Sequence, residues 1–176
     1  MKRSRILVLV SVLIISLLSG CSSGNTTVDV DLNSVLEAIK EELGEAYYPN
    51  RDMEIQELKD YTGLSDDQID EFIAQAPMMT VGVDTFIAIK ATEGNGDEVY
   101  AGLEKYRTYL VEESFQYPMN LPKVNTAKVV QYGDYSFFIM LGEYDESIED
   151  AESDQALEYY KSEVERVEKV IDEFFK

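Results

Sequence analysis

The chain has 176 residues, of which 45% are hydrophobic and 11% aromatic, so it carries enough apolar material for a folded core and is not a disordered chain. Its 35 acidic residues against 15 basic ones give a formal charge of -20, which argues against a surface that binds nucleic acid or anionic lipid headgroups. The absence of histidine and the single cysteine exclude the usual general base, the commonest zinc ligand and an internal disulfide.

The first twenty residues have the organisation of an export signal. A basic start is followed by an uncharged, mostly apolar run over residues 6–18, and then by Leu18-Ser19-Gly20-Cys21. A helix of that length spans about 20 Å, short of the roughly 30 Å hydrocarbon core of a bilayer. The four-residue sequence resembles a bacterial lipobox, which implies cleavage between Gly20 and Cys21 and a diacylglycerol thioether on Cys21. We therefore expect a signal peptide over 1–20 and a lipidated flexible tether over 21–29.

Helical patterns dominate the first half of the mature chain. Apolar residues at helical spacing predict a helix over 31–43, ended by Gly44. A short helix is expected over 53–62. Ser65 and Gln68 have the spacing of a capping box, which predicts a further helix over 65–75.

The second half combines strands and helices. Segment 81–91 is rich in β-branched residues and predicts a strand, 97–112 a helix, and the proline-containing 114–124 an irregular connection. Strands at 127–132 and 135–141 flank Gly133-Asp134, a two-residue hairpin signal, and the second strand is apolar on both faces, as expected of a central strand. A long helix over 147–174 ends the chain. We predict one α+β domain over 30–176, with a mainly antiparallel sheet of about three strands.

Two motifs with the beginnings of a binding loop fail on their remaining positions. Asp29, Asp31 and Asn33 open like a calcium loop, but Ser34 and Lys40 occupy the places that need glycine and a bidentate glutamate, so a helix N-cap is favoured. Gly94-Asn95-Gly96 lies between a strand and a helix, but the third glycine is missing and acids surround the segment. No nucleophile with an activating base stands out. We expect no cofactor, no metal site and no enzymatic activity.

Two sets of residues could form an interaction surface. The first is a group of tyrosines at turns or on a helix edge, for which partly buried core positions are the competing interpretation: Tyr47, Tyr48, Tyr117, Tyr159 and Tyr160. The second is the heptad-like stripe of the last helix: Leu157, Tyr160, Val164, Val167, Ile171 and Phe174. This helix either docks on its own sheet or projects as a seam for a partner. We expect docking over about 147–160 and exposure towards Phe174.

Taken together, these features resemble a known group of proteins. The lipobox, the apolar segment from Pro77 to Ala91 and the Gly133-Asp134-Tyr135 hairpin are similar to those of small lipoproteins common in Gram-positive anaerobes, defined by a domain of unknown function. The resemblance covers about residues 30–145. It implies a surface lipoprotein without an established activity, and it assigns no functional residues.

The leading hypothesis is a non-catalytic binding domain, anchored by the lipid on Cys21 to the extracytoplasmic face of the cell membrane. Its partner would be another protein or an envelope component, and not a nucleic acid. Two alternatives stay open at this point. One is an accessory lipoprotein that binds a small molecule or a cation, and the other is an envelope hydrolase that uses a pair of carboxylates.

Overall fold

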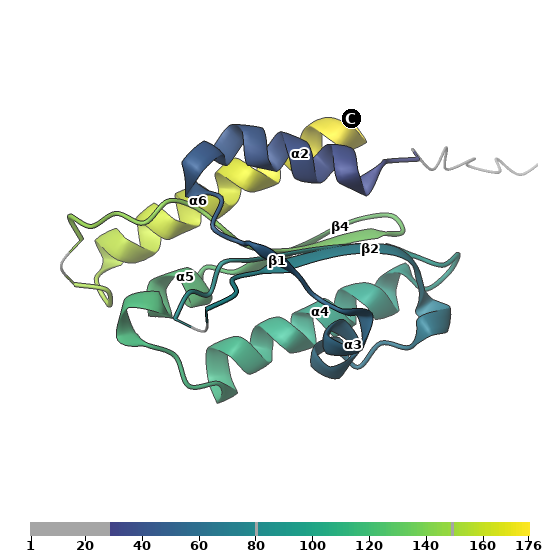
Figure 1. The fold of residues 1–176 in the computed structure, drawn as a ribbon, viewed down its shortest axis with the longest axis horizontal. Helices are drawn as coiled ribbons and strands as arrows, with labels where there is room; N and C mark the ends of the chain where they lie inside the picture. The colour runs from purple at the N-terminus through teal and green to yellow at the C-terminus, as the bar shows by residue number, and fades with distance from the viewer. Residues whose placement is uncertain (1–28, 80, 149) are drawn as a thin grey trace, which may run out of the picture.

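The fold consists of a sheet between two pairs of helices (Figure 1). The computed structural model describes residues 29–79, 81–148 and 150–176. Helices α2 (Leu32–Leu43) and α6 (Asp154–Asp172) cover one face of the sheet, and α3 (Ile55–Thr62) and α4 (Gly96–Thr108) cover the other. The predicted signal peptide, the cleavage site after Gly20, the lipidation site Cys21 and the tether up to residue 28 lie outside the described residues. No helix within the described residues is long and apolar enough to cross a membrane.

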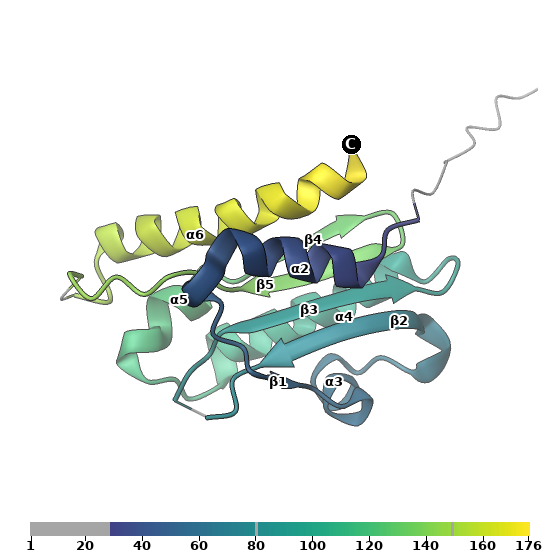
Figure 2. The same ribbon diagram turned by 45° about the horizontal axis from the view of Figure 1, so that its top comes forward.

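All strand pairs of the sheet are antiparallel. The strands are β1 (Arg51–Asp52), β2 (Ile69–Ala76), β3 (Thr85–Ala91), β4 (Lys128–Tyr132) and β5 (Tyr135–Met140), in the order β1-β2-β3-β5-β4 (Figure 2). The α+β class is confirmed. The expected number of about three strands is wrong, because the described residues form five.

The segment predicted as a helix over 65–75 is mostly strand β2. The capping box is present, but it begins only a single 3₁₀ turn at Asp66–Gln68. After this turn the chain is extended and pairs with β3. The register of this pairing shifts between Ile69 and Glu71. The extra residue places Ile69 and Phe72 in the same core and Ile73 in the opposite one. The bulge thus gives Ile69 and Phe72 the three-residue spacing of a helix, and the core on the other face of the sheet accounts for the apolar Ile73 beside them.

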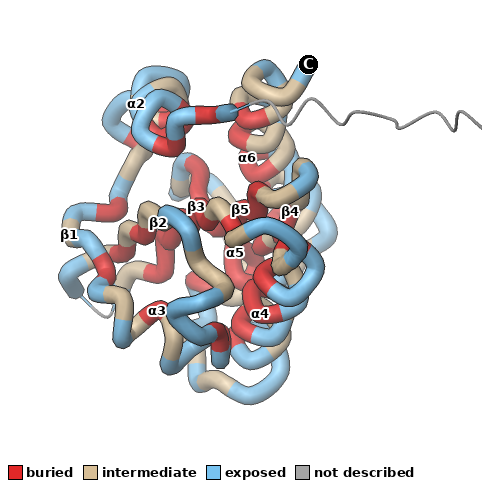
Figure 3. Tube along the Cα trace, turned by 90° about the vertical axis from the view of Figure 1, so that its right-hand side faces the viewer, coloured by how far each residue is buried: buried red, intermediate tan, exposed pale blue. Residues whose placement is uncertain are grey.

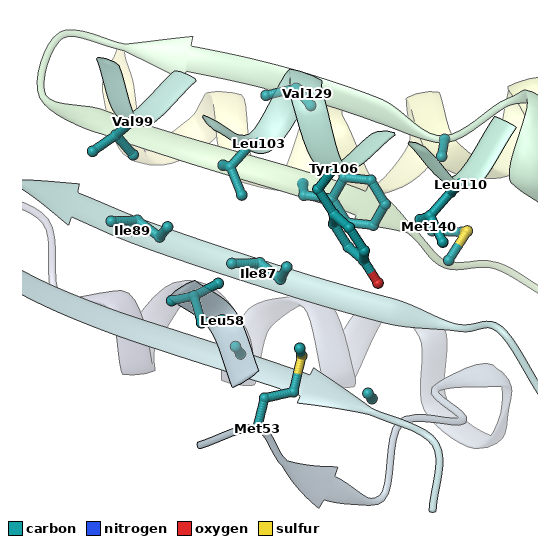
Figure 4. Close-up of a cluster of buried hydrophobic side chains, with 14 of the residues drawn as sticks. Met53, Leu58, Ile87, Ile89, Val99, Leu103, Tyr106, Leu110, Val129 and Met140 are labelled. Carbon is teal, nitrogen blue, oxygen red and sulfur yellow. The ribbon is translucent and has the colours of Figure 1, made fainter. Parts of the chain in front are cut away.

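Strand β5 confirms the prediction of a central strand covered on both faces. All six of its residues are buried, and Phe138 and Met140 face the core beneath α4 while Phe137 and Ile139 face the core beneath α2 and α6. In the first core, Val99 and Leu103 of α4 lie over the sheet (Figure 4). The hairpin signal is also confirmed, since Tyr132 pairs with Tyr135 across the Gly133-Asp134 turn.

The connection between α4 and β4 is more ordered than predicted. After Thr108 a π-helical turn continues to Glu113, and the segment expected to be irregular contains a 3₁₀ turn at Pro118–Asn120 and the short helix α5 (Leu121–Asn125). Proline at the start of each turn lacks only an N–H that would have no helical partner there, so both prolines favour these helical turns.

The last helix is packed against the domain along its whole length: its first turns lie against α5, and its later turns lie in the core beneath α2 and α6. It begins at Asp154, later than the predicted residue 147, because the Ser153 hydroxyl caps it by accepting from the Ala156 N–H at 3.2 Å. Val167 and Ile171 are completely buried, and Phe174 packs against the same core. Figure 3 shows buried positions along α6 in red. The expected exposure towards Phe174 is therefore wrong, and Val167, Ile171 and Phe174 do not form a free seam for a partner. The Phe175 ring stacks on that of Tyr132, with centroids 4.4 Å apart, and this contact attaches the C-terminal end of the helix to β4.

Candidate ligand-binding groove

A buried ion pair lies at the end of the sheet where β3 begins and β5 ends. Asp84 directly precedes β3, and Lys123 belongs to α5. The Lys123 Nζ donates to Asp84 Oδ1 at 2.7 Å and to the carbonyl oxygen of Gly142 at 2.8 Å. The two side chains are 0% and 1% exposed. A charge without solvent must be paired and hydrogen-bonded, so this contact holds three segments at fixed positions.

Three tyrosine rings surround the ammonium group of Lys123. Its Nζ lies 3.5 Å from the ring centroid of Tyr144, and 5.6 and 5.7 Å from those of Tyr48 and Tyr160. The Tyr144 hydroxyl also donates to the second carboxylate oxygen of Asp84, at 2.9 Å. The negative ring faces and the carboxylate together replace the water that the cation has lost.

Burial acts on the ionisation of both members of the pair. It raises the pKa of the Asp84 carboxyl and lowers the pKa of the Lys123 ammonium, while the attraction between them opposes both shifts. Burial and the charge of Asp84 raise the pKa of the Tyr144 hydroxyl, which keeps it a proton donor to the carboxylate. Because these groups face one another and not solvent, we assign them to the framework of the site.

Two cavities open beside this framework and meet at Met119 and Tyr144. The first, of about 320 Å³, is lined by Tyr48, Asn50, Pro77, Met79, Val81, Gly82, Asp84, Met119, Asn120 and Tyr144. The second, of about 450 Å³, is lined by Pro118, Met119, Pro122, Tyr144, Asp145, Glu146, Ile148, Ala151 and Tyr160. We call the two together the groove. Both volumes fall in the range of ligand pockets.

Exposed apolar side chains border the groove on the loops before β3 and before α5. Met79 is 73% exposed and Phe115 is 90% exposed. The Asn120 side chain joins the two loops by donating to the Val81 carbonyl at 2.8 Å. We call the exposed apolar side chains of these loops the apolar rim. Met79, Val81 and Met119 line the groove, Met78 and Tyr117 are next to lining residues in the chain, and the Phe115 ring lies edge-on to that of Tyr117. Such a concentration of exposed large apolar residues marks a contact surface more often than chance exposure.

The other border of the groove is acidic. Asp145 and Glu146 line the second cavity, whereas none of the described residues that line either cavity is a lysine or an arginine. The same negative potential reaches the first cavity, because burial and then the charges of Asp84, Glu143 and Glu146 raise the pKa of the Tyr48 hydroxyl. The groove is thus apolar on its floor and one border, and negative on the other.

Only some of the tyrosines proposed from the sequence as an interaction surface lie at the groove. Tyr48, Tyr117 and Tyr160 lie in the groove or on its apolar rim. Tyr47 does not, because it is partly buried and its hydroxyl donates to Gln75 Oε1 at 2.7 Å. Tyr159 packs edge-on against Tyr160.

The ion pair was not predicted from the sequence. Asp84 and Lys123 are 39 positions apart, and each is one charge among many. The one local signal is that Lys123 lies within an apolar, proline-flanked stretch. Methionines at 78, 79 and 119 gave no periodicity that would have grouped them.

Other candidate sites in the described residues are weaker. A third cavity of about 500 Å³ between α3 and the end of α4 is lined by Asp60, Tyr61, Lys105, Thr108, Tyr109 and Glu113. It lacks a buried polar group. In the part of the chain that the structure describes, no cluster of three or more acidic or cysteine side chains could hold a metal ion.

Comparison with known families identifies the domain. The family model described as Domain of unknown function (DUF4358) matches residues 42–141, which are 100 of the 176 residues, so the chain belongs to this family. The match includes Asp84 and Lys123 and ends just before Gly142 and Tyr144. No curated protein and no solved structure matches the chain.

Proposed function

We propose that this protein is a non-catalytic binding domain, held by a lipid on Cys21 at the extracytoplasmic face of the cell membrane, and that the groove is its binding site. One observation carries the proposal: exposed methionines and aromatic rings gather around two adjoining cavities above a rigid buried framework. Soluble domains rarely leave such side chains in water, because each exposed apolar group forgoes the free energy of burial.

The form of the site supports binding over catalysis. The polar groups that converge on it, Asp84, Lys123 and the Tyr144 hydroxyl, are saturated by one another, and Lys123 has no exposed surface. A general acid or base must reach the proton that it transfers. These groups instead position the walls of the groove, which is the role expected in a ligand site.

The lipobox supports the location of the domain. A chain that is exported and acylated at Cys21 would remain at the membrane surface, because each buried methylene of the acyl chains contributes about 0.8 kcal/mol. The family match does not bear on the location of the domain, which is tested separately.

Mass spectrometry of membrane fractions should find an acylated N-terminal Cys21, and Cys21→Ala should leave the precursor uncleaved. Normal processing and membrane retention of the Ala variant would contradict the anchor.

Binding of Nile red, an uncharged apolar dye, tests the groove. The assay uses a chain from residue 22 to 176, which keeps every described residue. We expect strong dye emission from the parent protein and a several-fold weaker signal from Met119→Glu, since the charge would enter the apolar rim. Tyr109→Glu is the matched control, because it places the same charge in the third cavity, on a side chain that is also exposed. No emission from the parent, or equal loss in both variants, would overturn the groove as the site.

A second candidate ligand is a small apolar molecule. The first cavity alone, at about 320 Å³, could hold one, and its lining is apolar apart from two asparagines, Asp84 and the tyrosine hydroxyls. Native mass spectrometry of protein purified from membranes would reveal such a molecule as a constant added mass that Met119→Glu abolishes.

A further inference from the structure

We infer that the occupant of the groove is a segment of a partner polypeptide that combines apolar side chains with lysine or arginine. This inference rests on the proposed function and specifies its ligand. It is carried by three features of the described residues: the adjacency of the two cavities, the charge of the border, and the position of the groove relative to the start of the domain.

The shape of the groove favours a chain over a compact molecule. The two cavities share Met119 and Tyr144, so a ligand that fills both must pass over these two side chains. Pro77 lines only the first cavity and Ala151 only the second, so the groove involves segments on both sides of these shared residues. An extended polypeptide can place alternate side chains into successive cavities in this way. Met78, Met79 and Met119 on the border are unbranched and flexible, which allows them to adapt to different apolar side chains.

The charge of the groove selects a basic partner. Asp145 and Glu146 line it, Glu143 and Glu146 act on Tyr48 within it, and Lys123 is neutralised by Asp84 beneath it. A lysine or arginine of the ligand would therefore meet carboxylates and tyrosine faces, both of which attract cations. A second copy of this chain, with its formal charge of -20, would be repelled.

The groove lies at the end of the sheet opposite the start of the domain. Asp29 pairs with Lys90 at 2.9 Å near the end of β3, whereas Asp84 precedes the beginning of that strand. The seven residues of β3 separate these points by roughly 20 Å. The beginning of α2, close to the first described residue, lies on the side of the domain away from α5 (Figures 1 and 2). With Cys21 anchored, the tether would join the domain at the end of the sheet away from the groove, so a polypeptide could reach the groove without meeting the tether.

A tryptophan-containing peptide provides a clean probe, because the protein has no tryptophan. The probe is a ten-residue synthetic peptide of alternating lysine and leucine with one central tryptophan, titrated with the chain from residue 22 to 176. Three matched peptides carry glutamine for lysine, glutamate for lysine, or serine for leucine. We expect the lysine–leucine peptide to bind with a blue-shifted emission and the glutamine peptide to bind about three- to tenfold more weakly. The glutamate and serine peptides should show no saturable binding.

Variants distinguish the groove from general attraction to an acidic protein. The pair Glu143→Gln and Glu146→Gln should weaken the lysine peptide by about three- to tenfold and leave the glutamine peptide unchanged. The control pair Glu93→Gln and Glu98→Gln removes the same charge from exposed positions at the opposite end of β3, and should change the affinity by less than about twofold. Equal weakening by both pairs would overturn the inference.

The outcomes separate this inference from the proposed function. If glutamine and glutamate peptides bind as tightly as the lysine peptide, and Met119→Glu abolishes all three, the groove is a binding site but its partner is not basic. If the dye and every peptide fail to bind, the proposed function itself is wrong. If vesicles of phosphatidylglycerol and phosphatidylethanolamine bind the protein in a manner that Met119→Glu abolishes, the occupant is the bilayer and the inference is overturned.

Discussion

The two ends of the sheet contain the same pair of residue types in opposite environments. Near the end of β3, Lys90 pairs with Asp29 at 2.9 Å and with Asp70 at 3.6 Å, and the Asp29 side chain is 86% exposed. Beside its beginning, Lys123 pairs with Asp84 with almost no exposure of either side chain. The first pair is one of many surface contacts, whereas the second fixes the position of the groove.

The loops that connect the strands also differ between the two ends of the sheet. At the first end the Gly133-Asp134 turn is short, and its Asp134 carbonyl accepts from the Ala91 N–H at 2.7 Å. At the groove end the connections are long, they carry most of the apolar rim, and Asn120 and Lys123 tie them together. One end of the fold is therefore closed by local turn geometry, whereas the other needs a buried charge network to hold an open surface.

The largest expected effect comes from removing the buried cation. Lys123→Met should destabilise the domain by about 3–5 kcal/mol, because Asp84 would stay buried without its partner. Lys90→Met, at the other end, should cost about 1 kcal/mol or less, since its partners are solvated. Urea unfolding of both variants measures the difference.

Restoring the balance of charge provides the control for this prediction. Adding Asp84→Asn to Lys123→Met removes the stranded carboxylate, so the double variant should be more stable than Lys123→Met alone. Equal stability of Lys123→Met and Lys90→Met would contradict the distinction between the two ends.

Glycine replacements compare the backbone at the two ends. At Gly142 the φ angle is +136°, and an added Cβ would lie 2.5 Å from the Cβ of Glu163. At Gly133 the φ angle is +62° and no atom lies within 4 Å of the added Cβ. We expect Gly142→Ala to cost about 3 kcal/mol and Gly133→Ala about 1 kcal/mol, measured by thermal unfolding. A larger loss at Gly133 would refute this order.

A smaller, pH-dependent effect is expected beside the loop that borders the groove. Arg51, whose Nε donates to the Pro77 carbonyl, forms a two-bond pair with Glu57 at 2.7 and 2.8 Å. Hydrogen bonds from Arg51 lower the pKa of Glu57, so the folded state binds its proton less readily than the unfolded chain. The pair therefore stabilises the fold above roughly pH 4.5 and loses this contribution as the pH falls.

Glu57→Gln tests this dependence. The variant should be less stable than the parent by about 1 kcal/mol or less at pH 7, since both side chains are partly exposed. The difference should shrink as the pH falls below roughly 4.5 and the parent also protonates Glu57. Unfolding curves over this range measure it, and a difference that grows on acidification would contradict the stated role of Arg51.

The smallest effect on stability belongs to the apolar rim. Met119→Ser removes a side chain that is 61% exposed, so unfolding free energy should change by less than about 0.5 kcal/mol. The same substitution should weaken the lysine–leucine peptide several-fold in fluorescence titration. A large loss of stability would show that Met119 belongs to the core and not to a binding surface.

Local patterns predicted the parts of the fold in which one segment decides its own structure. Apolar spacing located α2 and α4, and Gly133-Asp134 located the hairpin with its buried strand β5. The same kind of spacing failed at Ile69, Phe72 and Ile73, because a bulge in a strand imitates a helix. It also failed to show β1, whose two residues pair with Gln75 and Ala76 of β2.

The candidate site could be predicted only in part for a related reason. Tyr48, Tyr117 and Tyr160 were identified by residue type, since tyrosine is common at interfaces. Asp84 and Lys123 acquire their role from a contact across 39 positions, which no local pattern reports. The apolar stripe of α6 was recognised from its periodicity, but its role as a partner surface was not confirmed. Val167 and Ile171 are buried within the domain's own core.

The methionines permit the most direct test of the groove as a binding site for a basic, apolar polypeptide. Met78, Met79 and Met119 are exposed on its rim, while Met53 and Met140 are buried in the core beneath α4 and serve as internal controls. In a protein labelled with ¹³C at the methionine methyl groups, titration with the lysine–leucine peptide should shift the first three NMR signals and leave the other two unchanged. Saturable shifts confined to the rim methionines would support the account. Unshifted rim signals under conditions where the peptide is bound would contradict it.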